Sequence, residues 1–325
     1  MSRKVILALL LLAVPCWALT TITVNPGGGA DYTTTQDANN ALPNPLDDDY
    51  LITCSGATDD TTQTTIAPDM GGYTLTIRGD ATSGLFDDSK YQIKVSYSQT
   101  AITLNASGVT LENLQLTGIG ASTYSRMGIS VGGSYSNITI RNCLIQDFLQ
   151  SGSYAGIRVG SGTGANKRIY NNVIWNCVDG ISVLQGGNAE IYNNTIVDCT
   201  RYGLRVYKDT GDTIIAKNNL ISGSDTADWL TEGTAGTLTT AKNFTADGSS
   251  PDAGCANATI TFAGGEDFHL DASMNQDLRG VSLAGTFTVD IDGDTRAWWD
   301  PGADELSDPP TGPTIQQTWW GRRRQ

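Results

Sequence analysis

Four short segments of the chain repeat the pattern glycine, aliphatic residue, variable residue, valine, and two of them carry arginine at the variable position. The variable residues are, in chain order, Ser130, Arg158, Ser182 and Arg205. An arginine or lysine can neutralise the carboxylate of an acidic sugar, and it can also remove the neighbouring proton in a lyase reaction. Arg205, Lys208 and Arg158 are therefore candidate catalytic residues of a polysaccharide lyase.

Aromatic and acidic residues stand at the margins of this arginine pattern. Tyr154, Asp179 and Tyr202 are the candidate substrate-binding residues of the resulting strip. The structural alternative is an ordinary solvated surface, on which the arginines pair with Asp179 or Asp209 and contribute little to binding.

A second repeated pattern has an aliphatic residue, a variable residue and then asparagine. The variable positions are Glu112, Arg141, Tyr170, Tyr192 and Lys217. Two stacked tyrosines can form a flat platform for a sugar ring, so Tyr170 and Tyr192 are also candidate substrate-binding residues. They can equally form an aromatic pair between neighbouring strands that only stabilises the sheet.

Alternating acids near the C-terminal end are candidate metal ligands. Asp290, Asp292 and Asp294, with Gly293 between them, resemble the oxygen ligands of a calcium loop, although no glutamate follows at the distance that an EF-hand requires. A turn without metal is the alternative. The chain has one histidine, His269, and no Cys-x-x-Cys motif, which excludes the usual zinc motifs and a Ser-His-Asp or Cys-His nucleophile.

Composition narrows the class of partner. The 325 residues carry 20 Lys and Arg against 34 Asp and Glu, a net charge of −14, with a pI near 4.3. A duplex-binding protein needs a basic surface, so nucleic acid is excluded as a partner. Anionic polymers would be repelled unless a local basic strip or a divalent cation intervened.

The first 18 residues have the basic, apolar and small-residue regions of a secretory signal peptide, with cleavage expected after Ala18. We therefore expect an exported or cell-surface protein whose mature chain has no transmembrane segment. Five cysteines then remain, an odd number that argues against a disulfide scaffold. Cys177 and Cys199 occupy equivalent positions in adjacent repeats. We expect them to be buried, stacked thiols, and a disulfide between them is the alternative.

Internal repetition predicts the elements that position all of these residues. The asparagines of the second pattern lie at positions 113, 142, 171, 193 and 218, and the glycine pattern is interleaved with them. Two interleaved β patterns that share one repeat, whose length varies somewhat along the chain, indicate a structural unit stacked on itself. This predicts an all-β, right-handed, single-stranded parallel β-helix, in which the asparagine side chains bond up and down the stack.

The expected boundaries follow from these patterns. The β-helix domain spans 19–305, with a capping helix at 33–42, the clearest coils at 100–223 and irregular final coils at 224–305. Residues 306–325, which include Trp319, Trp320 and three arginines, are expected to be a flexible tail.

The opening VNPGGGADYTTTQDANNAL (24–42) and the ending DIDGDTR (290–296) followed by PGADE (301–305) are similar to secreted parallel β-helix proteins. The chain resembles the pectate-lyase-like superfamily, and in particular bacterial β-helix-repeat proteins of unassigned activity. Polygalacturonases of this superfamily place paired acids and a histidine on successive coils. Here Met127, Tyr154, Ala155 and Asp179 stand at those positions, so the resemblance does not extend to hydrolysis, which needs two carboxylates.

The resemblance and the residues together predict binding of an extended polysaccharide or cell-surface glycan along one sheet. A non-catalytic adhesin or spacer, and a lyase that acts on uronate polymers, are the alternatives. No cofactor is expected apart from the calcium considered above.

Overall fold

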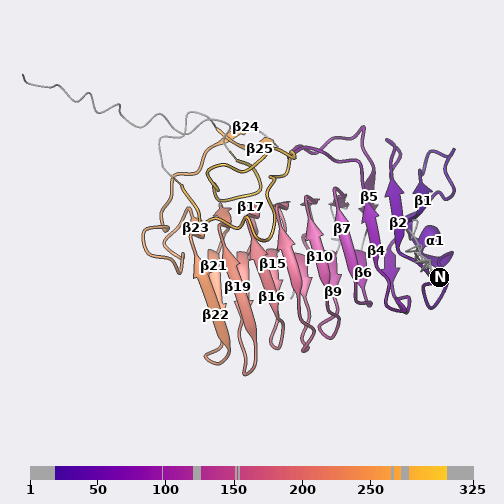
Figure 1. The fold of residues 1–325 in the computed structure, drawn as a ribbon. Coiled ribbons are helices and arrows are strands. Elements are labelled where there is room, and N and C mark those ends of the chain that lie inside the picture. Colours follow the sequence, from indigo (N-terminus) through magenta and orange to yellow (C-terminus); the bar gives the residue numbers. More distant parts are fainter. Residues whose placement is uncertain are drawn as a thin grey trace, which may run out of the picture.

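The computed structural model describes residues 19–96, 98–119, 126–150, 152, 154–264, 267–271 and 278–305. These residues wind into a parallel solenoid of about 7 turns, whose strands form three long sheets along a rod (Figure 1). The predicted all-β fold is confirmed. The expected signal peptide at 1–18 and tail at 306–325 lie outside the described residues, within which no helix is long and apolar enough to cross a membrane.

Each complete coil contributes one strand to each sheet, and all neighbouring strands within these sheets are parallel. Sheet A contains, in spatial order, β1 (Thr20–Val24), β2 (Tyr50–Cys54), β4 (Leu75–Arg78), β7 (Val109–Glu112), β10 (Ile138–Arg141), β13 (Lys167–Tyr170), β16 (Ala189–Tyr192), β19 (Thr213–Lys217) and β22 (Thr237–Ala241). Sheet B contains β5 (Gln92–Val95), β8 (Gln115–Gly118), β11 (Leu144–Gln146), β14 (Val173–Trp175), β17 (Thr195–Val197), β20 (Leu220–Ser222) and β23 (Phe244–Thr245). Sheet C contains β3 (Thr64–Ile66), β6 (Thr100–Leu104), β9 (Met127–Val131), β12 (Ala155–Val159), β15 (Asp179–Val183), β18 (Tyr202–Tyr207) and β21 (Ala227–Glu232).

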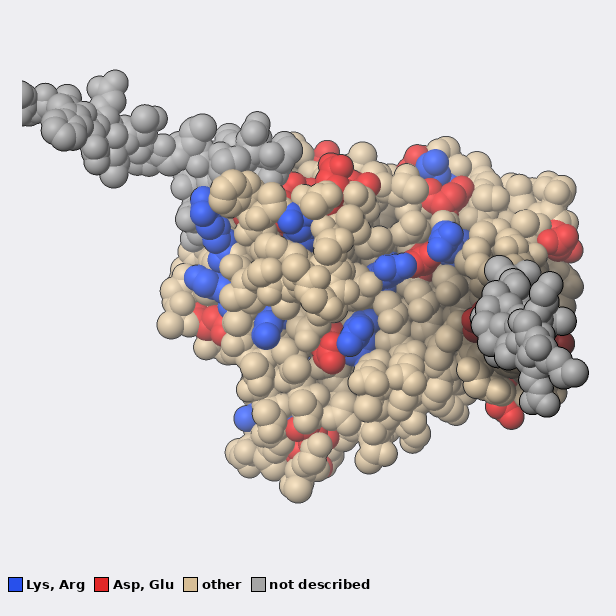
Figure 2. Space-filling model, viewed as in Figure 1, with Lys and Arg blue, Asp and Glu red and all other residues tan. Residues whose placement is uncertain are grey.

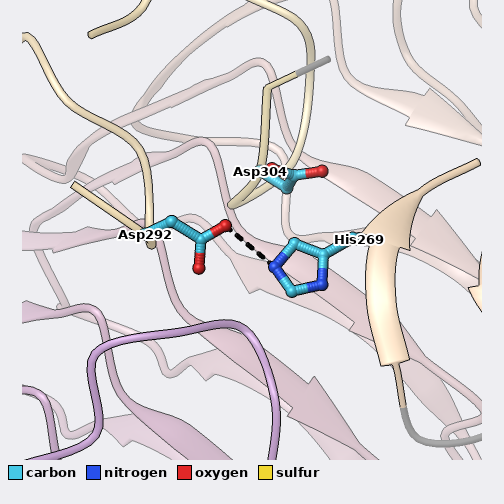
Figure 3. A group of neighbouring side chains, drawn as sticks. All are labelled: His269, Asp292 and Asp304. Carbon is cyan, nitrogen blue, oxygen red and sulfur yellow. Dashed lines mark hydrogen bonds and ion pairs between the residues drawn. The ribbon is translucent and has the colours of Figure 1, made fainter. Parts of the chain in front are cut away.

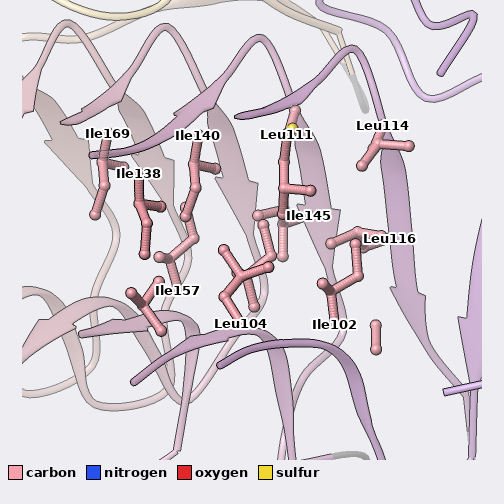
Figure 4. Close-up of a cluster of buried hydrophobic side chains, with 14 of the residues drawn as sticks. Ile102, Leu104, Leu111, Leu114, Leu116, Ile138, Ile140, Ile145, Ile157 and Ile169 are labelled. Carbon is pink, nitrogen blue, oxygen red and sulfur yellow. The ribbon is translucent and has the colours of Figure 1, made fainter. Parts of the chain in front are cut away.

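Aliphatic side chains from all three sheets fill the interior of the rod (Figure 4). Ile140, Ile169 and Ile191 are partners in adjacent strands of sheet A and are at most 1% exposed. Burying one such side chain stabilises the fold by about 1.5–3 kcal/mol, and the same gain recurs in every coil. The apolar repeat in the sequence is therefore the core of the solenoid.

The repeated glycine marks the point where the chain enters sheet C. A Cβ atom at Gly156 would lie 2.6 Å from Ile174 Cγ2 in the core and 3.0 Å from the Gly180 carbonyl oxygen of the next coil. A larger residue cannot fit without moving one of these neighbours. Close stacking of the coils therefore explains this glycine.

A ladder of asparagine side chains holds the corner between sheets A and B, but it is formed by the residue after the predicted one. The Oδ1 atom of Asn194 accepts hydrogen bonds from Asn172 N (3.1 Å) and Asn172 Nδ2 (2.9 Å), and Asn219 and Asn243 continue the ladder. The predicted asparagines instead have left-handed backbone, with φ of 53° at Asn171 and 46° at Asn193. Asparagine tolerates this conformation, so the first position makes the turn and the second satisfies buried backbone.

A short helix, α1 (Thr35–Asn40), caps the first coils as predicted, although it is shorter than 33–42. The Thr34 side chain accepts a hydrogen bond from Asp37 N, which is an N-cap contact. The buried Asp60 carboxylate accepts hydrogen bonds from Thr35 N (2.9 Å) and Tyr91 Oη (2.8 Å) and so fixes the helix on the rod.

The C-terminal segment, residues 246–305, differs from the prediction of further coils. The solenoid ends at β23, and the segment's described residues contain only the antiparallel pair β24 (Phe262–Gly264) and β25 (Asp267–Leu270). In Figure 1 this orange and yellow part lies beside the middle coils, where Phe268 packs on the outward Leu144 and Val173 of sheet B. These outward positions of sheet B are apolar, and covering them removes them from water.

The five cysteines of the described residues are free and buried, Cys177 and Cys199 among them. Of the two alternatives for that pair, the structure has the stacked thiols.

Candidate functional site

The predicted arginine strip lies on the outer face of sheet C. Arg158 of β12 is level with Ser130 of β9 and Ser182 of β15, and Ser182 is level with Arg205 of β18. The strands therefore bring together the four residues expected in one column. Ser182 is nevertheless buried, at 1% exposure, so the larger neighbouring side chains form the surface.

A network of ion pairs occupies one half of this strip. Asp179 is fully buried, and both of its carboxylate oxygens accept hydrogen bonds from the Arg201 guanidinium at 2.6 Å. Burial raises the pKa of the Asp179 carboxyl, and the guanidinium of Arg201 opposes that rise. The prediction of Asp179 as a substrate-binding residue is corrected here, because its side chain is enclosed and holds Arg201 in place instead.

Arg205 is held in the same network and is a poor candidate for a catalytic base. Its Nε lies 2.6 Å from Glu232 Oε2, and its Nη1 lies 3.9 Å from Asp179 Oδ2. The hydrogen bond to Glu232 raises the pKa of Arg205. A general base must be deprotonated before it can accept a proton from the substrate, so the raised pKa acts against that role. Lys208 follows the same strand and is half-buried, and it forms no ion pair among the described residues.

Arg158 forms no ion pair with any of the described residues. Its Nε atom is buried and has no hydrogen-bond partner in the part of the chain that the structure describes. A buried donor without a partner costs free energy, so the protein does not compensate this group. Two half-exposed tyrosines border the strip. Arg126 lies 5.7 Å from the ring centroid of Tyr154, and Arg201 and Arg205 lie 5.4 Å and 5.9 Å from that of Tyr202.

The second predicted column lies on the outer face of sheet A, where the C-terminal segment covers its tyrosines. Tyr170 and Tyr192 are partners in adjacent strands, as predicted, but they are only 6% and 5% exposed. Phe287 stacks on Tyr170 with 4.6 Å between ring centroids, and Trp299 packs in the same cluster. The prediction of an exposed sugar platform is therefore wrong, and the two tyrosines belong to a buried aromatic cluster instead.

The polar end of the same column is also neutralised within the protein. Glu112 lies between Arg78 and Arg141 and pairs with both. Burial acts to raise the pKa of Glu112, and the two guanidinium groups outweigh it, so that the pKa is lowered. Figure 2 shows basic and acidic side chains interspersed on the visible face, with no large area of one sign.

The predicted calcium ligands do not converge on one point. Asp290 Oδ1 accepts hydrogen bonds from the backbone N–H groups of Asp292 (3.0 Å) and Asp294 (2.9 Å), so its carboxylate closes the turn. Asp292 instead faces His269, while Asp294 is exposed. The calcium loop is corrected to a turn, and Asp292 belongs to a different cluster with His269 and Asp304, which sequence reasoning missed.

The asparagines of the turn anchor the C-terminal segment. Asn193 Nδ2 donates hydrogen bonds to the carbonyl oxygens of Asp300 (2.8 Å) and Gly302 (3.1 Å), and Asn171 Nδ2 donates to Val289 O (2.7 Å). The C-terminal sequence 290–305 is thus the part that docks on the asparagine corner.

Comparison with known proteins agrees with this architecture. The solenoid defines the class as a parallel β-helix protein, and the family model described as the right handed beta helix region matches residues 86–245. The chain is therefore a right-handed β-helix protein, and the match supports its predicted resemblance to the pectate-lyase-like proteins. No curated protein and no solved structure matches the chain.

Proposed function

We propose that the protein binds an extended, negatively charged polysaccharide along the outer face of sheet C. The observation that carries the proposal is Arg158, which lies in the middle of the sheet without an ion-pair partner among the described residues. A guanidinium group binds a carboxylate through two parallel hydrogen bonds, as the uronic acids of such polymers would permit.

The neighbouring residues suit an extended ligand. Ser130 and Ser182 are level with Arg158 on the two neighbouring strands, so no long side chain flanks it within the column. Tyr154 and Tyr202 add half-exposed aromatic side chains at the border of the strip, each in contact with an arginine. A local basic strip also answers the electrostatic objection raised by the net charge of −14.

Binding without catalysis is the favoured form of this function. The Arg205 side chain is engaged by Glu232 and Asp179, so it stabilises the strip rather than accepting a proton. The proposal also includes export from the cell, which rests on the signal-like residues 1–18. Edman sequencing of protein recovered from the culture medium should begin at Leu19.

Affinity electrophoresis in gels that contain polygalacturonate, alginate or neutral dextran tests the binding. We expect retardation by an acidic polymer and none by dextran. A charge-assisted hydrogen bond contributes about 1.5–3 kcal/mol, so Arg158→Gln should weaken binding by roughly 10- to 100-fold.

Arg168→Gln is the matched control, because Arg168 lies on sheet A and pairs with Glu190 at 3.0 Å. Its affinity should equal that of the unaltered chain. Failure of every acidic polymer to bind, or equal binding by the Arg158→Gln variant, would contradict the proposal and favour a spacer without a sugar site.

A further inference from the structure

The single histidine of the chain lies where three parts of the C-terminal segment meet. His269 is in β25, and its Nε2 lies 2.8 Å from Asp292 Oδ2 in the turn that begins at Asp290. Asp304 approaches from the end of the segment, and Figure 3 shows the three side chains next to one another. These residues are far apart in sequence, so the folded segment alone brings them together.

The cluster contains three potential metal ligands and a further residue that orients the histidine ring. One nitrogen and two carboxylate oxygens, from His269, Asp292 and Asp304, lie within 4.8 Å of one another. Ligand atoms around a tetrahedral zinc ion are about 3.4 Å apart, so closure requires only small side-chain movements. The other ring nitrogen of His269, Nδ1, is bonded to Asp267, an arrangement that orients metal-binding histidines.

The Asp304 side chain is enclosed next to His269 and Asp292. Asp304 is 8% exposed. Among the described residues, its carboxylate accepts one hydrogen bond, which Leu270 N donates to Oδ2 at 2.9 Å. The carboxyl groups of Asp290 and Asp292 lie close enough to interact with it electrostatically. A cation would relieve this confined negative charge.

We propose that His269, Asp292 and Asp304 bind one divalent ion of the zinc class, with a fourth position left for water. The imidazole ligand favours such ions over calcium, which prefers oxygen. Asp292 Oδ1 also accepts a hydrogen bond from Gly84 N at 3.1 Å, and Gly84 precedes β5 of the solenoid. The ion therefore cross-links distant parts of the C-terminal segment and, through Asp292, holds the segment against an early coil.

Proton NMR of the untagged chain tests this site directly, because His269 is its only histidine and gives one Hε1 signal. The protein is first treated with EDTA and then titrated with zinc chloride. We expect the signal to shift and to saturate at one equivalent, while the same amount of calcium chloride leaves it unchanged. A zinc titration that leaves the signal in place in the folded protein overturns the proposal.

Variants separate this site from adventitious binding. Isothermal titration calorimetry should show no stoichiometric zinc binding by Asp304→Asn, and a loss of roughly 10- to 100-fold for Asp267→Asn, which removes only the orienting partner. Asp294→Asn, an exposed acid of the same turn, should bind like the unaltered chain. Circular dichroism checks that each variant is folded. Equal affinity for all variants would assign the zinc to some other surface group and contradict the proposal.

Discussion

The Arg296→Met substitution should release the C-terminal segment from the rod and leave the coils folded. The guanidinium of Arg296 is fully buried. It donates hydrogen bonds to Asn171 Oδ1 (3.1 Å), Gly302 O (3.0 Å) and Ala303 O (2.6 Å), and it lies 3.6 Å from a Glu305 carboxylate oxygen. Methionine has a similar length but satisfies none of these acceptors.

The free-energy cost of the substitution follows from the buried charges that remain. Glu305 and Asp290 stay enclosed without their cation, and removing one partner of a buried pair costs about 3–5 kcal/mol. At about 1.4 kcal/mol for each factor of ten, the segment should open roughly 100 to several thousand times more often. The coils should not change, because the main core cluster contains no residue of the segment.

Hydrogen–deuterium exchange measured by mass spectrometry is the assay. Peptides from 278–305 should exchange faster in the variant by the factor above, while peptides from β10, β13 and β16 should be unaffected. Arg279→Met is the control, since Arg279 is exposed and stacks on Trp298 at 4.7 Å, a contact worth about 0.5–1 kcal/mol. Unchanged exchange at 278–305, or equal acceleration in the coils, would refute the reasoning.

Three further outcomes test the solenoid itself. Gly156→Ala should lower the free energy of unfolding in urea by about 1–3 kcal/mol, while Gly285→Ala, which has open space, should change it little; equal effects would contradict the close stacking of coils. Asn219→Leu leaves ladder donors unsatisfied and should cost at least about 2 kcal/mol in the same assay, and a neutral result would remove the ladder's role. Burial raises the pKa of the thiols of Cys54, Cys143 and Cys177 to about 12. Ellman's reagent at pH 8 should therefore leave these thiols unmodified until the protein is denatured. Rapid labelling of the native protein would count against their burial.

The sequence predicted the solenoid well because each coil repeats the same packing problem. The glycine and asparagine patterns set the register, so Arg158 next to Ser182 and Tyr170 next to Tyr192 were placed correctly. The ladder was assigned one residue too early, because adjacent asparagines carry the same sequence signal while only their backbone angles distinguish turn from ladder.

Sequence reasoning failed where contacts do not repeat. Nothing in the period indicates that Phe287 covers Tyr170, because the C-terminal segment crosses the coils instead of continuing them. The His269 cluster was missed for the same reason, since its ligands follow no motif spacing. The apolar outer positions of sheet B, such as Leu144 and Val173, were the available signal that something covers that face.

Arginine-selective labelling with phenylglyoxal, read by mass spectrometry, tests most directly whether sheet C is the glycan-binding face. The protein is labelled alone and then with saturating oligomers of the acidic sugar that binds in the gel assay. Arg158 should be modified in the free protein and protected in the complex, while Arg168 on sheet A should be modified equally in both. Equal modification of Arg158 with and without the oligomer, or protection of Arg168 instead, would contradict the account.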